Sequence, residues 1–167
     1  MLKLVLLSAL TALALTASGG ARAALGPDAA ACEPGARRPA LLVNVDGFKN
    51  RIGRIRLQLY GGNPDDFLER GKKLRRVDLP VSRSGAMQVC VAVPRAGIYA
   101  LAVRHDADAN GKTGWNDGGG FSNNPRLSLM NLKPNHKAAA ISVGNGVKPL
   151  SIVLNYRRGL SIAPIGR

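Results

Sequence analysis

The sequence predicts an all-β protein: a single antiparallel β-sandwich of about seven strands, of the immunoglobulin-like or transthyretin-like kind. Apolar and polar residues alternate in short runs, which is the period of strands with one wet face. Turn-forming glycine, proline and asparagine residues separate these runs, and at most one helical turn is indicated. We therefore expect two packed sheets, with no linker dividing the strands after residue 40.

The strand-forming runs differ in how many faces are apolar. Residues 40–46 and 54–59 alternate apolar and polar side chains, and Asp46 followed by Gly47 favours a turn after the first run. Residues 98–104 are apolar on both faces, so we expect a central strand that carries the following Asp-rich loop at its exit. The other predicted strands are residues 75–82, 86–93, 138–143 and 149–156.

Three connections carry predictions of their own. Residues 65–70 favour one helical turn, because two acidic residues open it and Gly71 follows it. The Gly-Asn-Gly of residues 144–146 favours a hairpin between the last two strands. Residues 127–132 form a weak strand or an irregular stretch between two turn signals.

The two ends lack strand periodicity. Residues 1–23 have the charged, apolar and small-residue order of a secretory signal, so we expect cleavage after Ala23 and export to the periplasm or the extracellular space. No later apolar run approaches the about 20 residues that span a bilayer. Residues 24–39 form an expected flexible lead-in, 40–156 the β-sandwich domain, and 157–167 a basic tail that is expected to fray.

Two cysteines, Cys32 and Cys90, suit an oxidising compartment. A disulfide between them would pin the lead-in to a core strand. The alternative is lipid attachment at Cys32, although this residue lies far beyond the N-terminal apolar run.

The chain is strongly basic. Loss of residues 1–23 lowers the formal net charge from +14 to +12. We expect an anionic envelope polymer or an acidic protein as partner rather than nucleic acid, because aromatic residues for base stacking make up only 4% of the chain. The alternative is a solvated basic surface. The expected partner-binding residues are Lys49, Arg51, Arg54, Arg56, Arg75, Arg76 and Trp115.

One segment, residues 104–124, has the residue types of a specific site. Its Asp, Asn and Gly residues occupy positions 1, 3, 5, 6 and 12 of a loop, the order in which Ca²⁺ collects oxygen ligands along a turning chain. We expect weak binding, with a dissociation constant of about 10⁻⁴–10⁻³ M. The alternative is that these side chains only make Asx-turns to their own backbone. The predicted ligands are the side chains of Asp106, Asp108, Asn110 and Asp117 and the backbone carbonyl of Lys112.

Two further interpretations concern the same segment. His105 beside Asp106, with Ser122 or His136, suggests a hydrolase, but neighbours along a strand point to opposite faces and adjacency does not orient an imidazole. Trp115 either stacks on a partner or, as we favour, folds back to cap the open end of the sandwich core.

The same loop resembles a known family. Residues 105–124 follow a strand that begins at residue 97. They contain, in order, His-Asp, a second Asp, Asn-Gly-Lys and Gly-Phe-Ser-Asn-Asn. This pattern resembles that of the bacterial exported proteins grouped as domain of unknown function 2141. The resemblance covers about residues 40–155 and implies an exported β-sandwich whose activity is not established. The family's Gly-x-Pro-x-Glu element is replaced here by the shorter residues 115–119, which removes an acidic residue.

Together these patterns indicate an exported binding or accessory module, with a calcium-ordered loop and a basic face. The alternatives are an envelope hydrolase that uses His105 and Asp106, and a purely structural domain.

Overall fold

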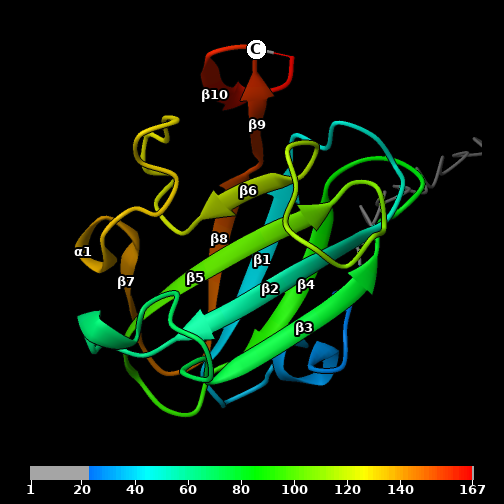
Figure 1. Cartoon of the computed structure of the whole chain (residues 1–167). Helices are drawn as coiled ribbons and strands as arrows, with labels where there is room; N and C mark the ends of the chain where they lie inside the picture. The colour runs from blue at the N-terminus through cyan, green and yellow to red at the C-terminus, as the bar shows by residue number, and fades with distance from the viewer. Residues whose placement is uncertain (1–22, 167) are drawn as a thin grey trace, which may run out of the picture.

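Two β-sheets pack face to face around one main core in the computed structural model, which describes residues 23–166 (Figure 1). The all-β sandwich predicted from the sequence is confirmed. Apart from Ala23, the predicted signal peptide lies outside the described residues. In the described part of the chain no helix is long and apolar enough to cross a membrane.

The smaller sheet has the strand order β4-β1-β8. Its strands are β1 (Ala40–Asp46), β4 (Met87–Ala92) and β8 (Val147–Val153). β1 pairs with β4 in antiparallel fashion and with β8 in parallel, so β1 lies buried in the middle of this sheet.

The larger sheet is built around β5 (Gly97–Asp106), as its two apolar faces predict. Its path is β10-β9-β6-β5-β2-β3, and β7 pairs with the first part of β5 while β6 pairs with the last part. The remaining bounds are β2 (Arg54–Tyr60), β3 (Arg75–Pro80), β6 (Gly118–Phe121), β7 (Ala140–Val143), β9 (Asn155–Arg158) and β10 (Ser161–Pro164). The short helices are η1 (Ala29–Cys32), η2 (Pro64–Asp66) and α1 (His136–Ala139).

The core lies between the sheets because alternate side chains of each strand point to it. Leu41 and Val43 of β1 face Leu57 and Leu101 of the larger sheet within the main apolar cluster, and all four are fully buried. Burial of each such side chain stabilises the fold by about 1.5–3 kcal/mol.

The larger sheet also carries a second apolar cluster on its outer face. Phe67, which follows η2, packs edge to face on Tyr60 and Phe121 and covers Ala100 and Ala102. The helical turn expected at residues 65–70 is shorter in the structure: it is the 3₁₀ turn η2, Pro64–Asp66. The Asn63 side chain caps it by accepting a hydrogen bond from the Asp65 N–H. Residues 127–132 contain only the bridge between Ser128 and Asn131.

The hairpin predicted at residues 144–146 is wrong. β7 pairs with β5 in the larger sheet, whereas β8 pairs with β1 in the smaller one, so the connection passes between sheets. A turn signal fixes where the chain reverses but not which strands pair, and here pairing follows burial of the apolar residues in both sheets.

The lead-in of residues 24–39 is pinned to β4, as expected if Cys32 and Cys90 form a disulfide. Leu25 pairs with Val89, and the disulfide Cys32–Cys90 joins η1 to β4 with 5.9 Å between the Cα atoms. Asp28 forms an ion pair with Arg75. Closing a loop with a sequence separation of 58 residues stabilises the fold by about 4 kcal/mol in the entropic model.

The predicted fraying of residues 157–167 also differs from the structure over the described part of that segment. β10 pairs with β9 through the register Ser161↔Arg158 to Pro164↔Asn155 and extends the edge of the larger sheet. The two strands are only four residues long, and Gly159 between them indicates a turn, so the sequence pattern did not reveal them.

Candidate functional site

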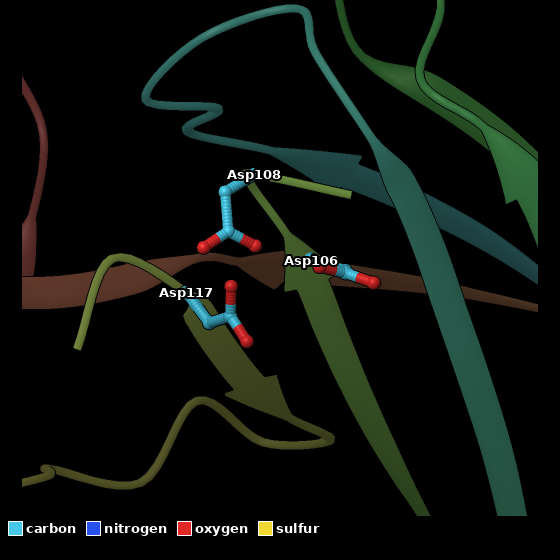
Figure 2. A group of neighbouring side chains, drawn as sticks. All are labelled: Asp106, Asp108 and Asp117. Atoms are coloured by element: carbon cyan, nitrogen blue, oxygen red, sulfur yellow. The ribbon is translucent and has the colours of Figure 1, made fainter. Parts of the chain in front are cut away.

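The Asp-rich loop, residues 107–117, joins β5 to β6 at one end of the larger sheet (Figure 2). Because β5 and β6 are antiparallel, with His105 opposite Gly118, the two ends of the loop are adjacent. Asp106 from the end of β5, Asp108 from the loop and Asp117 from its last position each offer a carboxylate oxygen, and these oxygens lie within 4.8 Å of one another. The sequence spacing therefore brings together the three predicted carboxylate ligands.

The first half of the loop is turned by its own side chains. Oδ1 of Asp108 accepts from the Asn110 N–H at 3.2 Å, and Oδ1 of Asn110 accepts from the Lys112 N–H at 2.7 Å. Gly111 has a φ of 76°, so it makes the sharp turn expected at the sixth position. These are the Asx-turn bonds of the alternative interpretation, and they coexist with the carboxylate cluster.

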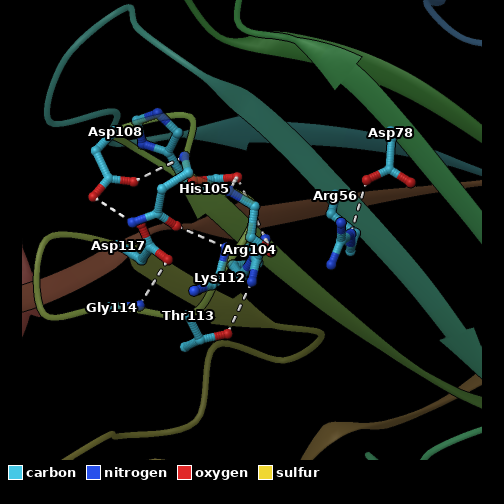
Figure 3. Close-up of polar contacts among 12 residues, drawn as sticks. Arg56, Asp78, Arg104, His105, Asp108, Lys112, Thr113, Gly114 and Asp117 are labelled. Carbon is cyan, nitrogen blue, oxygen red and sulfur yellow. Dashed lines mark hydrogen bonds and ion pairs between the residues drawn. The ribbon is translucent and has the colours of Figure 1, made fainter.

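Asp117 fastens the second half of the loop. Its Oδ1 accepts from the Ala107 N–H at 3.1 Å, and its Oδ2 accepts from the Gly114 N–H at 3.0 Å (Figure 3). Carboxylate oxygens have further lone pairs, so these bonds leave room for a cation ligand.

Asp106 is the buried member of the cluster. Its side chain is only 6% exposed, and its Oδ2 accepts from the Gly111 N–H at 2.9 Å. Its Oδ1 is buried and has no hydrogen-bond partner. Burying a carboxylate oxygen without a partner lowers the stability of the fold, because the oxygen loses its hydrogen bonds to water and no other hydrogen bond replaces them. A cation bound by the carboxylates of Asp106, Asp108 and Asp117 would offset the cost of burying the Asp106 charge.

The structure places the other two predicted ligands, Asn110 and Lys112, in the same turn, where Oδ1 of Asn110 accepts from the Lys112 N–H. The Asn110 amide nitrogen donates to Oδ2 of Asp108 at 2.7 Å, so that its amide is adjacent to a candidate ligand. Lys112 is exposed and uses its backbone N–H in the turn.

Arg104 also belongs to the site, although it is not among the predicted ligands. Nη1 donates to Oγ1 of Thr113 at 2.9 Å, and Nη2 donates to the Gly111 carbonyl at 3.3 Å (Figure 3). Nη2 also lies 3.5 Å from Oδ2 of Asp106. The signal was present in the sequence: residues two apart on a strand share a face, so Arg104 must lie beside Asp106.

The family match covers most of the two sheets and the whole candidate site. Residues 43–151 match a family described as an uncharacterized protein conserved in bacteria, DUF2141. The chain belongs to this family. The match runs from β1 into β8 and includes the Asp-rich loop, which confirms the resemblance based on that loop. No curated protein and no solved structure matches the chain.

The histidine of this DUF2141 chain that lies next to the cluster is a core residue. His105 is fully buried on the face opposite Asp106. Its Nε2 lies 2.9 Å from the Ile52 carbonyl, which can only accept, so Nε2 carries the proton. Its Nδ1 then accepts from the Tyr156 hydroxyl at 2.6 Å. Both ring nitrogens are engaged within the protein.

The other residues of the hydrolase hypothesis are likewise held elsewhere. The Ser122 hydroxyl is buried, accepts from the Leu101 N–H at 2.9 Å and donates to the Ala139 carbonyl. His136 binds the Gly61 carbonyl through Nε2 at 2.9 Å. Among residues 23–166, no hydrogen bond joins either histidine to a serine or a carboxylate, so no nucleophile and base are assembled.

Half of the predicted basic face is paired with acids. Arg56 binds Asp78 at 2.8 Å (Figure 3). Arg76 also binds Asp78, and Arg75 binds Asp28. Burial alone would raise the pKa of Asp78, but the hydrogen bonds from Arg76 and Arg56 outweigh it and lower this pKa. These three arginines are therefore tied to their own sheet and to the residue that precedes η1.

The other half remains available. Arg51 stacks over Phe48 at 4.8 Å and donates to the Gly85 carbonyl, and neither contact neutralises its charge. Lys49 donates to the Asn116 side chain at 3.5 Å. Arg54 is exposed and forms no ion pair with the described residues.

Trp115 does not cap the core, so the favoured interpretation of this residue is wrong. It is 70% exposed at the tip of the loop, and the guanidinium of Arg157 lies 4.0 Å from its ring centroid. Trp115 stays exposed because the loop around Gly114 lies over the outer face of the larger sheet, beside Ala102 and Phe121, and does not enter the space between the sheets.

Proposed function

We propose that this DUF2141 protein is an exported binding module whose Asp-rich loop is ordered by Ca²⁺. One observation supports the cation above all: the Asp106 carboxylate, whose Oδ1 is buried without a partner, offers an oxygen within 4.8 Å of oxygens of Asp108 and Asp117. Oxygen ligands from carboxylates and amides are the set that Ca²⁺ takes in proteins. The disulfide Cys32–Cys90 supports an oxidising compartment.

The affinity expected from the charges is weak. Asp106 already faces Arg104, and the last acidic position holds Asp117 rather than the usual longer glutamate. We therefore expect a dissociation constant of about 10⁻⁴–10⁻³ M, in the range of extracellular calcium modules. At ten times that concentration, mass action stabilises the fold by about 1.4 kcal/mol.

The test is thermal unfolding in EDTA and in millimolar Ca²⁺. The melting temperature of the parent protein rises with Ca²⁺, whereas that of Asp106→Asn does not respond, because the amide lacks the charge that holds the cation. Asp65→Asn is the matched control, since Asp65 is exposed on η2 and far in sequence from the loop, and its variant responds like the parent.

A second readout uses the loop itself. Trp115 is the only tryptophan of the chain, so excitation of this residue sensitises Tb³⁺ bound in place of Ca²⁺. Saturable Tb³⁺ emission that Ca²⁺ displaces supports the site. An unchanged melting temperature together with absent Tb³⁺ emission would show that the cluster serves turn chemistry alone.

The second part of the proposal is an anionic envelope partner on the basic face. It is supported by the exposed, unpaired Arg54 and by Arg51 and Lys49, whose contacts leave their charges unbalanced. The expected consequence is retention on a polyanion that depends on salt and weakens when Arg51 and Arg54 lose their charge.

A further inference from the structure

A cleft that the cation site does not explain lies on the outer face of the larger sheet. Its volume is about 340 Å³, and it lies between the Asp-rich loop, residues 122–135 and the β9–β10 edge. Figure 1 shows these three segments around β6. Apolar side chains form most of its wall: Phe121, Leu127, Leu129, Leu132 and Ile162.

The floor of the cleft contains a glycine that packing does not require. Gly119 lies within β6, and a Cβ built on it would meet only the Val103 carbonyl oxygen, at 3.9 Å. The neighbouring Gly118 and Gly120 differ, because their Cβ atoms would overlap Tyr156 and Ile152 in the core. Glycine weakens a strand and often marks a place where a ligand approaches closely.

The rim of the cleft is positively charged. Arg157 lies over the Trp115 ring, and Lys133 forms no ion pair with the described residues. Arg104 lies directly opposite Gly119 in the register, but its charge is paired with Asp106 and its Nη atoms donate to Thr113 and Gly111. Asp117 is the acidic residue of the cleft wall, and both of its carboxylate oxygens accept hydrogen bonds from backbone N–H groups, those of Ala107 and Gly114.

We propose that this cleft binds an anionic amphiphile, a small apolar body with one carboxylate, with the body over Gly119 and the carboxylate between Arg157 and Lys133. The apolar wall fits the body, and the basic rim complements the head. The volume is at the lower end of the about 300–1,000 Å³ of small-molecule pockets, so the body is short. Binding in this cleft does not require the cation site.

The test is a titration with decanoate, decanol and decyltrimethylammonium, followed through the fluorescence of Trp115 at the rim. Decanoate gives a saturable change at one molecule per chain. Decanol binds at least about tenfold more weakly, and the cation gives no saturable change, because the rim repels it. Equal affinity for decanoate and decanol would overturn the charge assignment and with it the proposal.

Variants locate the binding. Gly119→Val fills the floor and abolishes decanoate binding, while its far-ultraviolet circular dichroism stays that of the parent, because the structure has space for the new side chain. Gly144→Val is the matched control, since nothing lies within 4 Å of its added Cβ, and it binds like the parent. Arg157→Met lowers decanoate affinity and leaves decanol affinity unchanged. Decanoate binding that survives in Gly119→Val would overturn the proposal.

Two further measurements distinguish binding in the cleft from cation binding and from insertion of loop tips into a lipid surface. The decanoate titration is run once in EDTA and once in Ca²⁺, and saturable decanoate binding in either condition supports the cleft. The cation site is tested separately, by the response of the melting temperature to Ca²⁺. The second measurement is co-sedimentation of the protein with phosphatidylglycerol vesicles. If the bound fraction is the same for Gly119→Val and does not change when free decanoate is added, the proposal of binding in the cleft is overturned. Lipid contact then occurs through the exposed loop tips at Trp115, Met130 and Leu160.

Discussion

The Tyr156 hydroxyl connects three segments of the chain next to the candidate cation site. It donates to Nδ1 of His105 and accepts from the Lys49 N–H at 3.1 Å. His105 in turn donates to the Ile52 carbonyl, so the pair ties β9, β5 and the β1–β2 connection together inside the protein. Satisfied polar groups of this kind hold the end of β5 rigid and thereby fix where Asp106 lies.

Burial, more than any opposing contact, raises the pKa of Tyr156 from 10.0 to about 12. The unfolded chain therefore loses this proton at a lower pH than the folded protein. The stability contributed by Tyr156 is complete below pH 10 and is lost as the pH rises toward 12.

We predict that the free energy of unfolding falls by on the order of 2 kcal/mol from this residue over that interval. Tyr156→Phe is less stable at neutral pH, because Nδ1 of His105 loses its donor, but its stability declines less steeply in alkali. Urea unfolding at a series of pH values measures both slopes. Parallel pH profiles for the two proteins would contradict the prediction.

Residue patterns in the sequence correctly located the acidic cluster, because Asp106, Asp108 and Asp117 lie on one short loop whose ends are joined by strand pairing. They misjudged Trp115, because exposure depends on which way a loop leaves its sheet, and glycine-rich loops leave that direction open.

At the scale of elements, β6 is the strand that the sequence pattern did not reveal. Its Gly-Gly-Gly-Phe sequence has low strand propensity, and it forms because β5 and β9 supply partners on its two sides. Its glycines are not equivalent: Gly118 and Gly120 face the core, where Tyr156 and Ile152 fill the space, and Gly119 faces the cleft.

We predict a matching contrast in stability. Gly118→Ala and Gly120→Ala each lower the free energy of unfolding by about 1–3 kcal/mol, because the added Cβ forces neighbouring side chains or backbone to move. Gly119→Ala is neutral or stabilises by up to about 1 kcal/mol, because it only restricts the unfolded chain. Guanidinium unfolding of the three variants measures the differences, and equal losses at all three positions would contradict the assignment of faces.

At the scale of the whole molecule, basic residues outnumber acidic ones 24 to 10, and ion pairs with the few acids decide which charges remain free. Asp78 and Asp28 neutralise part of the predicted basic face. Arg51, in the β1–β2 connection, and Arg54, the first residue of β2, are exposed and keep their charge available to an anionic partner.

We predict that Arg51→Gln/Arg54→Gln elutes from heparin-agarose at lower NaCl concentration than the parent, because exposed charges bind a polyanion in a salt-dependent way. The control Arg95→Gln/Lys137→Gln changes the net charge equally at exposed positions elsewhere. It elutes close to the parent. If both double variants shift by the same amount, retention reflects net charge and no basic face exists.

The sequence by itself determined the all-β class, most strand positions, the disulfide pair and the loop with its three converging acids. These features depend on local periodicity and spacing, which the chain carries along its length. The tertiary structure alone decided the pairing of β7 and β8 with different sheets, the order in residues 24–39 and 157–164, the formation of β6 and the cleft over Gly119. Each of these depends on which distant surfaces bury one another, and such contacts leave no period in the sequence.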